Sequence, residues 1–167
     1  MAFNMKKNVL IKFTLILVFI LGTKISVAQT KSETEKWLIS IIGDPEYRYN
    51  SYHSYDIYFE NGNMKIISPW LGKQYEYKIP LKSLGKIKLQ KLDDGYRLIL
   101  SCANDACIKY GEYVDGNENN YLFKSYNKQT IIMFGPNLEF DDLTSRLKKA
   151  IKHIVQLNGG KLVEEPF

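Results

Sequence analysis

The sequence predicts an α+β fold: an antiparallel sheet or partly open barrel of about seven or eight strands, a short N-terminal helix, and a long C-terminal amphipathic helix packed on the sheet. Three observations lead to this fold class. Between about residues 54 and 135, short runs rich in aromatic and β-branched residues alternate with turn residues. No helical pattern separates these runs, so the strands are expected to pair antiparallel. The flanking segments carry apolar residues at helical spacing.

A short amphipathic helix is predicted over residues 30–43, TKSETEKWLISIIG. Ser32 followed by Glu35 fits a capping box, in which each side chain satisfies a free backbone N–H group at the helix start. An apolar stripe at helical spacing consists of Thr34, Trp37, Leu38 and Ile41. Gly43 is expected to end the helix in a left-handed conformation. A helix this short needs tertiary packing of its stripe to be stable.

The central part of the chain has the pattern of about eight strands. The runs are residues 55–59, 64–67, 75–79, 87–89, 96–102, 108–110, 121–126 and 131–134. Asn61-Gly62 and Asp93-Asp94-Gly95 lie between successive runs and are typical of hairpin turns. The third run stops at Pro80, which lacks the N–H group that a strand ladder needs.

Residues 142–158, DLTSRLKKAIKHIVQLN, predict the C-terminal helix. Its apolar face consists of Leu143, Leu147, Ala150, Ile151, Ile154 and Leu157. Its basic face consists of Arg146, Lys148, Lys149, Lys152 and His153. We interpret the basic face as solvated, with a partner site as the alternative. Asp141 and Asp142 at the start complement the helix dipole, and Gly159-Gly160 ends the helix.

Residues 1–28 have the layout of a cleavable secretory signal peptide. Lys6 and Lys7 form a positive n-region, and residues 13–21 form an apolar h-region. Ser26-Val27-Ala28 supplies small residues at the −3 and −1 positions. The apolar segment is shorter than the ~20 residues that a membrane-spanning helix needs.

Cleavage is therefore expected after Ala28, which leaves a single α+β domain over residues 29–167 with no stable membrane anchor. The location is expected to be periplasmic or secreted. The whole chain has 23 Lys and Arg against 18 Asp and Glu, and residues 1–28 hold four of the lysines and no acid. The remaining 19 basic and 18 acidic residues nearly balance, which argues against nucleic acid as a partner.

Cys102 and Cys107 are the two cysteines of the chain, in SCANDACIKY. Asn104-Asp105 fits a two-residue hairpin turn, which makes the cysteines a non-hydrogen-bonded pair with Cα atoms about 4.5 Å apart. That separation suits a disulfide, and the thiols of an exported protein tend to oxidise. The spacing differs from the C-x-x-C of a thioredoxin-like site. We predict a disulfide that fixes one hairpin, with reactive thiols or half of a metal site as the alternatives.

Residues 46–60, EYRYNSYHSYDIYFE, hold five tyrosines. If a strand begins at Tyr52, its first face is His53, Tyr55, Ile57 and Phe59, and its second is Tyr52, Ser54, Asp56, Tyr58 and Glu60. The candidate binding residues are Tyr47, Tyr49, Tyr52 and Tyr58, as an aromatic platform for a sugar or peptide. The alternative is that the first face is core and the second is a solvated sheet surface.

Catalytic and metal-binding motifs are absent from the sequence. His53 near Asp56 suggests a general base with its orienting carboxylate, but no nucleophile elbow, zinc motif or phosphate loop accompanies the pair. Residues 115–120, DGNENN, begin like a calcium loop but lack its sixth-position Gly and twelfth-position Glu, so a polar hairpin loop is predicted. No cofactor, no metal and no catalytic residue are expected.

The order of strands followed by one amphipathic helix resembles a pleckstrin-homology-like barrel, in which the C-terminal helix plugs an open end. Residues 77–87, YKIPLKSLGKI, are similar to the strand, short IPL corner and strand of such barrels. The chain also resembles small secreted bacterial proteins with a T-x-x-W-L opening helix (Thr34 to Leu38), a cysteine-flanked hairpin and a terminal Gly159-Gly160. The resemblance implies a fold and no activity. Residues 59–64, FENGNM, lack the basic residues with which such domains bind phosphoinositides.

The sequence therefore favours an exported, non-enzymatic binding or adaptor module whose partner is a protein, peptide or glycan of the cell envelope. The second hypothesis is a small inhibitor of an extracytoplasmic enzyme, such as a cell-wall hydrolase, with Asn104-Asp105 as the inhibitory loop. The third is a small enzyme that uses His53 and Asp56.

Overall fold

The computed structural model describes residues 29–70, 73–113 and 120–163. The expected signal peptide and nearly all of the expected polar loop at residues 115–120 lie outside the described residues. In the described part of the chain, no helix is long and apolar enough to cross a membrane.

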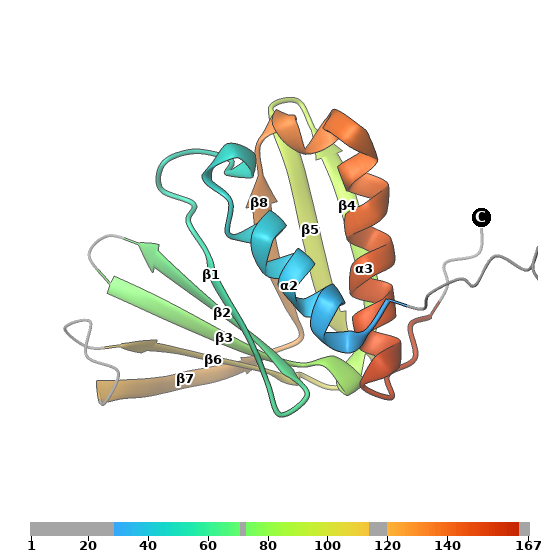
Figure 1. The fold of residues 1–167 in the computed structure, drawn as a ribbon. Helices are drawn as coiled ribbons and strands as arrows, with labels where there is room; N and C mark the ends of the chain where they lie inside the picture. Colours follow the sequence, from blue (N-terminus) through green and yellow to red (C-terminus); the bar gives the residue numbers. More distant parts are fainter. Residues whose placement is uncertain (1–28, 71–72, 114–119, 164–167) are drawn as a thin grey trace, which may run out of the picture.

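The described strands form two antiparallel sheets (Figure 1). The five-stranded sheet has the order β1 (Asp56–Glu60), β2 (Asn63–Trp70), β3 (Lys73–Pro80), β6 (Ile108–Tyr113) and β7 (Tyr121–Asn127). The three-stranded sheet has the order β4 (Leu84–Leu92), β5 (Gly95–Cys102) and β8 (Gln129–Phe134). The α+β class, the antiparallel pairing and the number of strands are confirmed. The described ladders do not close into a barrel: β1 and β7 are the edge strands of one sheet, and β4 and β8 are those of the other.

Local turn chemistry fixes the hairpins that the sequence predicts. Asn61 and Gly62 join β1 to β2 with φ of 47° and 75°, the left-handed values of a type I′ turn. Asp93 and Asp94 join β4 to β5. A 3-10 turn, Leu81–Ser83, follows Pro80 at the corner where the chain leaves the five-stranded sheet.

Helix α2 spans Lys31–Ile42, but its capping box lies two residues earlier than predicted. The hydroxyl of Thr30 accepts a hydrogen bond from Glu33 N at 3.2 Å, and the Glu33 carboxylate accepts one from Thr30 N at 2.8 Å. Thr30 can act as the cap because its backbone is extended, whereas Ser32 already lies in the first turn. Gly43 ends the helix with φ of −82°, so the predicted left-handed cap is also wrong.

Helix α3 spans Leu143–Leu157 and buries the predicted apolar face except for Leu157, which is exposed. Val155 is buried in its place. Gly160 N donates to Val155 O at 2.9 Å, so the chain turns back over Val155 and leaves Leu157 on the outside of the last turn. Asp142 precedes the helix in a left-handed conformation, and its side chain accepts no capping hydrogen bond.

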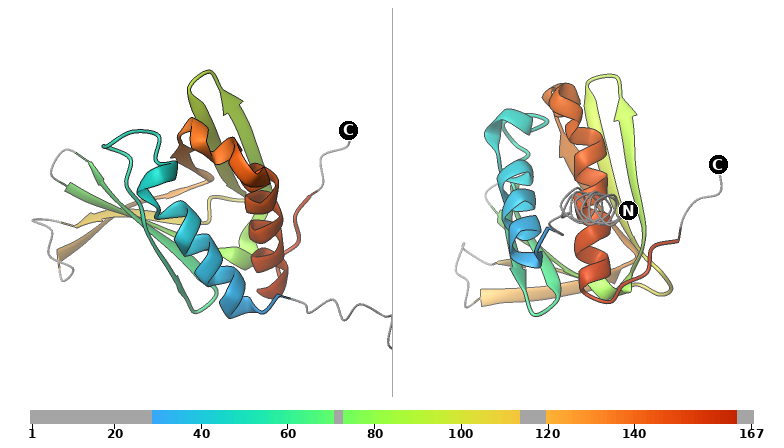
Figure 2. Two further views of the ribbon diagram at one scale, coloured as in Figure 1. Left: turned by 45° about the horizontal axis from the view of Figure 1, so that its top comes forward. Right: turned by 45° about the vertical axis from the view of Figure 1, so that its right-hand side comes forward.

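The core lies between the two helices and one face of each sheet (Figures 1 and 2). Helix α2 lies between α3 and β1, and α3 packs along β4. The fully buried residues include Leu38, Leu98, Leu100, Ile132, Ile151 and Ile154. The five-stranded sheet extends beyond the helices. On the inner face of this sheet, the rings of Tyr75 and Tyr77 stack on the ring of Tyr110, with centroids 6.0 and 5.0 Å away.

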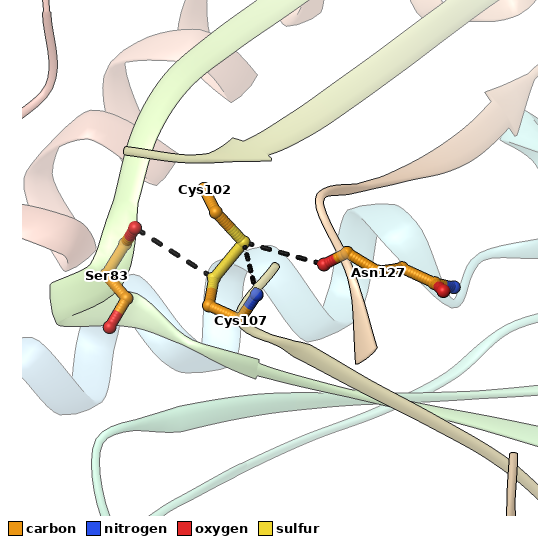
Figure 3. Close-up of a disulfide and its surroundings, with 4 residues drawn as sticks. All are labelled: Ser83, Cys102, Cys107 and Asn127. Carbon is orange, nitrogen blue, oxygen red and sulfur yellow. Dashed lines mark hydrogen bonds between the residues drawn. A yellow bond between two sulfur atoms is a disulfide. The ribbon is translucent and has the colours of Figure 1, made fainter. Parts of the chain in front are cut away.

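The predicted Cys102–Cys107 disulfide is present, but the predicted hairpin around it is wrong (Figure 3). Cys102 ends β5 in the three-stranded sheet, whereas Cys107 directly precedes β6 in the five-stranded sheet. The Cα atoms lie 5.9 Å apart. The carbonyl oxygens of Ser83 and Asn127 lie 4.0 and 3.7 Å from the two sulfur atoms. The disulfide therefore ties the two sheets together at the point where the chain passes from one to the other.

Candidate binding face

The outer face of the five-stranded sheet, opposite the helices, carries a row of lysines. The strand registers place Lys65 of β2 opposite Lys78 of β3, and Lys78 opposite Lys109 of β6. Tyr58 of β1 lies opposite Lys65 at one end, and Tyr126 of β7 lies opposite Lys109 at the other. We call these five residues the lysine–tyrosine row.

The two-residue period of each strand directs these side chains outward. In β2, Met64 and Ile66 on either side of Lys65 are buried in the core. In β3 and β6, the buried Ile79 and Ile108 are the immediate neighbours of the lysines of the row. Because successive side chains of a strand point to opposite faces, burial of the isoleucines forces the lysines onto the outer face.

Two carboxylates neutralise one end of the row. The Nζ atom of Lys65 lies 3.2 Å from Glu76 and 3.7 Å from Glu60, and Lys78 Nζ lies 3.6 Å from Glu60. Burial opposes charge on Lys65, but the hydrogen bond and charge of Glu76, with those of Glu60, raise its pKa above the usual value. Lys65 therefore remains cationic.

Lys109 has a different environment. Its Nζ atom lies 4.8 Å from the ring centroid of Tyr121 and 5.8 Å from that of Phe123. Among the residues that the structure describes, no carboxylate lies within 4.0 Å of this ammonium group. Two aromatic rings thus hold a cation whose counter-charge the described chain does not supply.

A glycine makes room for the ring beside Lys109. Gly111 lies opposite Glu76, and a Cβ atom at Gly111 would lie 2.5 Å from both Cζ and Oη of Tyr121. The Tyr121 hydroxyl is buried and has no hydrogen-bond partner among the described residues. Burial, followed by the charge of Glu76, raises the pKa of Tyr121. Tyr113 donates its hydroxyl to Glu76, so this carboxylate is buried although it faces outward.

A β-bulge in β7 brings a second aromatic ring to the same face. The register changes between Tyr110 and Gly111, whose partners are Ser125 and Phe123, and Lys124 is the extra residue. Phe123 and Tyr126 therefore lie on one face, with ring centroids 5.3 Å apart. The two ends of the row are open to solvent, because Tyr58 is 51% exposed and Tyr126 is 59% exposed.

The structure does not bring the four candidate tyrosines together. Tyr47 ends the 3-10 turn Pro45–Tyr47, and its carbonyl accepts from Gly135 N at 2.9 Å. Tyr49 donates its hydroxyl to Asp94, next to β5. Tyr52 is exposed in a turn, and Tyr58 alone belongs to the lysine–tyrosine row.

The expected strand from Tyr52 begins instead at Asp56. Asn50 holds residues 50–53 in a turn: its side-chain oxygen accepts from Tyr52 N at 3.0 Å, and its carbonyl accepts from His53 N at 3.2 Å. Within the strand, the interpretation of one core face and one solvated face agrees with the structure. Tyr55 and Ile57 are buried, and the alternate positions of β1 are exposed.

The structure places His53 beside Asn50 and Tyr49. Its Nδ1 atom forms a 2.7 Å hydrogen bond with Asn50 Oδ1, and its ring meets Tyr49 edge-on at 5.5 Å. Burial lowers the pKa of His53, the opposite of the shift that an orienting carboxylate produces. In the ranges that the structure describes, no cluster of three His, Cys, Asp or Glu side chains is arranged to hold a metal ion.

The sequence reasoning missed Lys65, Lys78, Lys109 and Tyr126. Each of the three lysines lies beside a buried apolar residue in its own strand, and that was the available signal. Their alignment depends on the pairing of β3 with β6, which are distant in sequence.

Comparison with known proteins adds no relative. No protein-family model matches the chain, and neither a curated protein nor a solved structure matches it.

Proposed function

We propose that the protein is an exported, non-enzymatic binding module of the cell envelope or extracellular space, and that the lysine–tyrosine row binds an acidic glycan. The observation that carries the proposal is the alignment of Lys65, Lys78 and Lys109 directly opposite one another across three strands. Glu60 and Glu76 offset the charges of Lys65 and Lys78, whereas Lys109 has no described counter-charge. A carboxylate of the ligand would supply that counter-charge.

The shape of the row suits a linear polymer that crosses the strands. Five adjacent strands are separated by four spacings of ~4.8 Å, so the row is about 19 Å long. Lysines occupy its centre and exposed tyrosines its two ends. Tyrosine offers a rigid apolar ring and a polar tip, which together suit the apolar faces and hydroxyls of sugars. Carboxylates along an acidic glycan would meet the lysines, and Lys109 in particular lacks a described counter-charge.

Export is supported by two independent features. Residues 1–28 have the three regions of a signal peptide, in the required order. The Cys102–Cys107 disulfide suits an oxidising compartment outside the cytoplasm. The intact mass of protein recovered from the extracytoplasmic fraction tests this: we expect a chain that begins at Gln29. A chain that retains residues 1–28 would contradict cleavage, and absence of the protein from that fraction would contradict export.

The ligand class can be tested with alginate, a polymer of uronic acids, and with neutral dextran as the control polymer. We expect affinity electrophoresis to show retention of the protein by alginate, falling as salt is added, and none by dextran. Lys78→Gln and Lys109→Gln should each weaken retention about three- to fivefold, the effect of a single exposed ion pair. Lys88→Gln, an exposed lysine of β4 outside the row, is the matched control. Equal losses of alginate retention in all three variants would contradict binding at the lysine–tyrosine row.

An inhibitor of a cell-wall hydrolase is the second candidate, and one observation favours it. All four residues of the loop 103–106 are exposed, and the disulfide closes the loop. Ala103 N also donates to Ser83 O at 2.9 Å, which fixes the loop at its base. A rigid exposed loop is pre-organised for insertion into an active site. Inhibition of a panel of muralytic enzymes at micromolar concentration tests this candidate, and absence of inhibition would remove it.

A further inference from the structure

Strand β7 forms one edge of the five-stranded sheet, and within the described ranges it pairs with β6 alone (Figures 1 and 2). An edge strand presents unpaired backbone N–H and C=O groups along its free side. Large apolar side chains on such an edge make it a template for another strand, so natural proteins usually shield or charge their edges.

Both faces of β7 expose large apolar side chains. Leu122 on the inner face and Phe123 on the outer face are each 45% exposed, and Tyr126 is 59% exposed. Three such residues in a strand of seven, Tyr121–Asn127, form a dense apolar edge. Added on its free side, a further strand would cover side chains on both faces.

The other described edges are protected. The edge strand β4 exposes Lys86, Lys88 and Lys91, and its Gly85 O accepts from Val163 N at 2.7 Å. In the β8 edge strand, backbone groups bond to the segment before β1: Met133 N donates to the Tyr55 hydroxyl at 3.1 Å. Strand β1 is short, has an acidic residue at each end, and lies beside α2. Strand β7 also exposes Lys124, but it differs from these edges in exposing three large apolar side chains, Leu122, Phe123 and Tyr126.

We propose that β7 accepts an extended, acidic segment of another protein as a sixth strand. This proposal does not depend on the glycan ligand, because that ligand crosses the strands on the outer face, whereas the peptide runs along the edge. Main-chain hydrogen bonds would supply affinity, and alternate side chains of the peptide would supply specificity.

The lysines around β7 favour a partner peptide with negative charge. Lys124 Nζ lies 2.8 Å from one carboxylate oxygen of Glu112, and Lys73 Nζ lies 3.5 Å from the other. One carboxylate thus serves two lysines on the inner face. On the outer face, Lys109 has no described counter-charge, and the exposed Lys128 directly follows β7. Among the described residues, an acidic peptide therefore meets more lysines than carboxylates along this edge.

A second copy of this chain fits the edge less well. A two-fold axis would pair β7 with itself in antiparallel fashion. Lys124 is the central residue of Tyr121–Asn127, so the pairing centred on the strand places Lys124 opposite its own copy. Directly opposed lysines repel, whereas an acidic peptide places a carboxylate near Lys124.

The test begins with selection from a displayed library of random twelve-residue peptides on the chain that starts at Gln29. We expect enrichment of peptides that alternate acidic and apolar residues. The best of these, as a synthetic peptide, should bind with micromolar Kd and slow amide hydrogen exchange in β7. The same peptide N-methylated at alternate residues should lose at least tenfold in affinity, because it cannot form a ladder.

Substitutions locate the binding surface. Leu122→Ser should weaken the selected peptide at least fivefold, whereas Ile131→Ser should not; Ile131 is a matched control, because it is 41% exposed on the edge strand β8. Lys78→Gln, which should weaken alginate retention, should leave peptide affinity unchanged, so failure of either proposal is recognisable.

Three outcomes would overturn strand addition: no acidic alternating sequence is enriched, the N-methylated peptide binds as well as its parent, or protection falls outside β6 and β7. A dimer in sedimentation experiments at 100 µM that Leu122→Ser dissociates would also overturn it, because the edge would then belong to a second copy.

Discussion

Removal of the cross-link between Cys102 and Cys107 should lower the free energy of unfolding by an amount that follows from the length of the loop it closes. The two cysteines are five residues apart in sequence, so the closed loop is short. In the chain-entropy model, a loop of this length contributes about 2 kcal/mol at 25 °C. For a domain of this size, that free energy corresponds to a fall in Tm of about 7 °C.

Urea unfolding of the oxidised and reduced wild-type protein measures the cross-link alone, because both thiols stay in place. The double variant Cys102→Ala/Cys107→Ala additionally removes the sulfur of Cys102, which is buried. We therefore expect the variant to be less stable than the reduced wild type by up to about 1 kcal/mol, the value of a small buried group. An oxidised-minus-reduced difference near zero, or above ~4 kcal/mol, would refute the entropic reasoning.

Hydrogen exchange tests where the cross-link acts. Because the disulfide joins the two sheets, reduction should speed exchange where β5 meets the segment before β8, at the 2.9 Å bond from Cys102 N to Lys128 O. The hairpin at Asn61-Gly62, which has its own ladder, should be unaffected. Equal acceleration in both places would mean that the disulfide supports global stability alone.

Three further predictions concern local contacts. Gly111→Ala should destabilise the protein by about 1–3 kcal/mol in urea unfolding, because the new Cβ overlaps Leu122 O and the ring of Tyr121. A loss below about 0.5 kcal/mol would mean that the Tyr121 ring is not held against Gly111. Thr30→Ala should cost about 1 kcal/mol by thermal unfolding and Ser32→Ala much less, since Thr30 is the cap; the reverse order would restore the cap predicted from the sequence. The hydrogen bond and charge of Lys124 lower the pKa of Glu112. The pair therefore stabilises the fold above the usual carboxyl pKa, and this stability is lost as pH falls through the lower pKa of the folded state. Lys124→Gln should flatten that part of the stability–pH curve, and an unchanged curve would contradict the prediction.

Much of the fold follows from the sequence because its determinants are local. The two-residue period of the strand runs, the Asn61-Gly62 turn and the apolar face of residues 143–154 each act over a few residues. The α+β class, the antiparallel strands, the first hairpin and the C-terminal helix are confirmed for that reason. The misplaced cap at Ser32 shows the limit of local signals, because two adjacent capping patterns compete and the backbone at Thr30 decides between them.

The sequence pattern does not predict which distant strands pair. Alternation shows which side chains share a face, but not which strand lies alongside, because that choice depends on how the whole core packs. The pairing of β5 with β8 and of β3 with β6 therefore splits the strands into two sheets and turns an expected hairpin disulfide into an inter-sheet link. The same registers align Lys65, Lys78 and Lys109. The sequence by itself determined the elements and their buried faces, and the tertiary structure decided which side chains became neighbours.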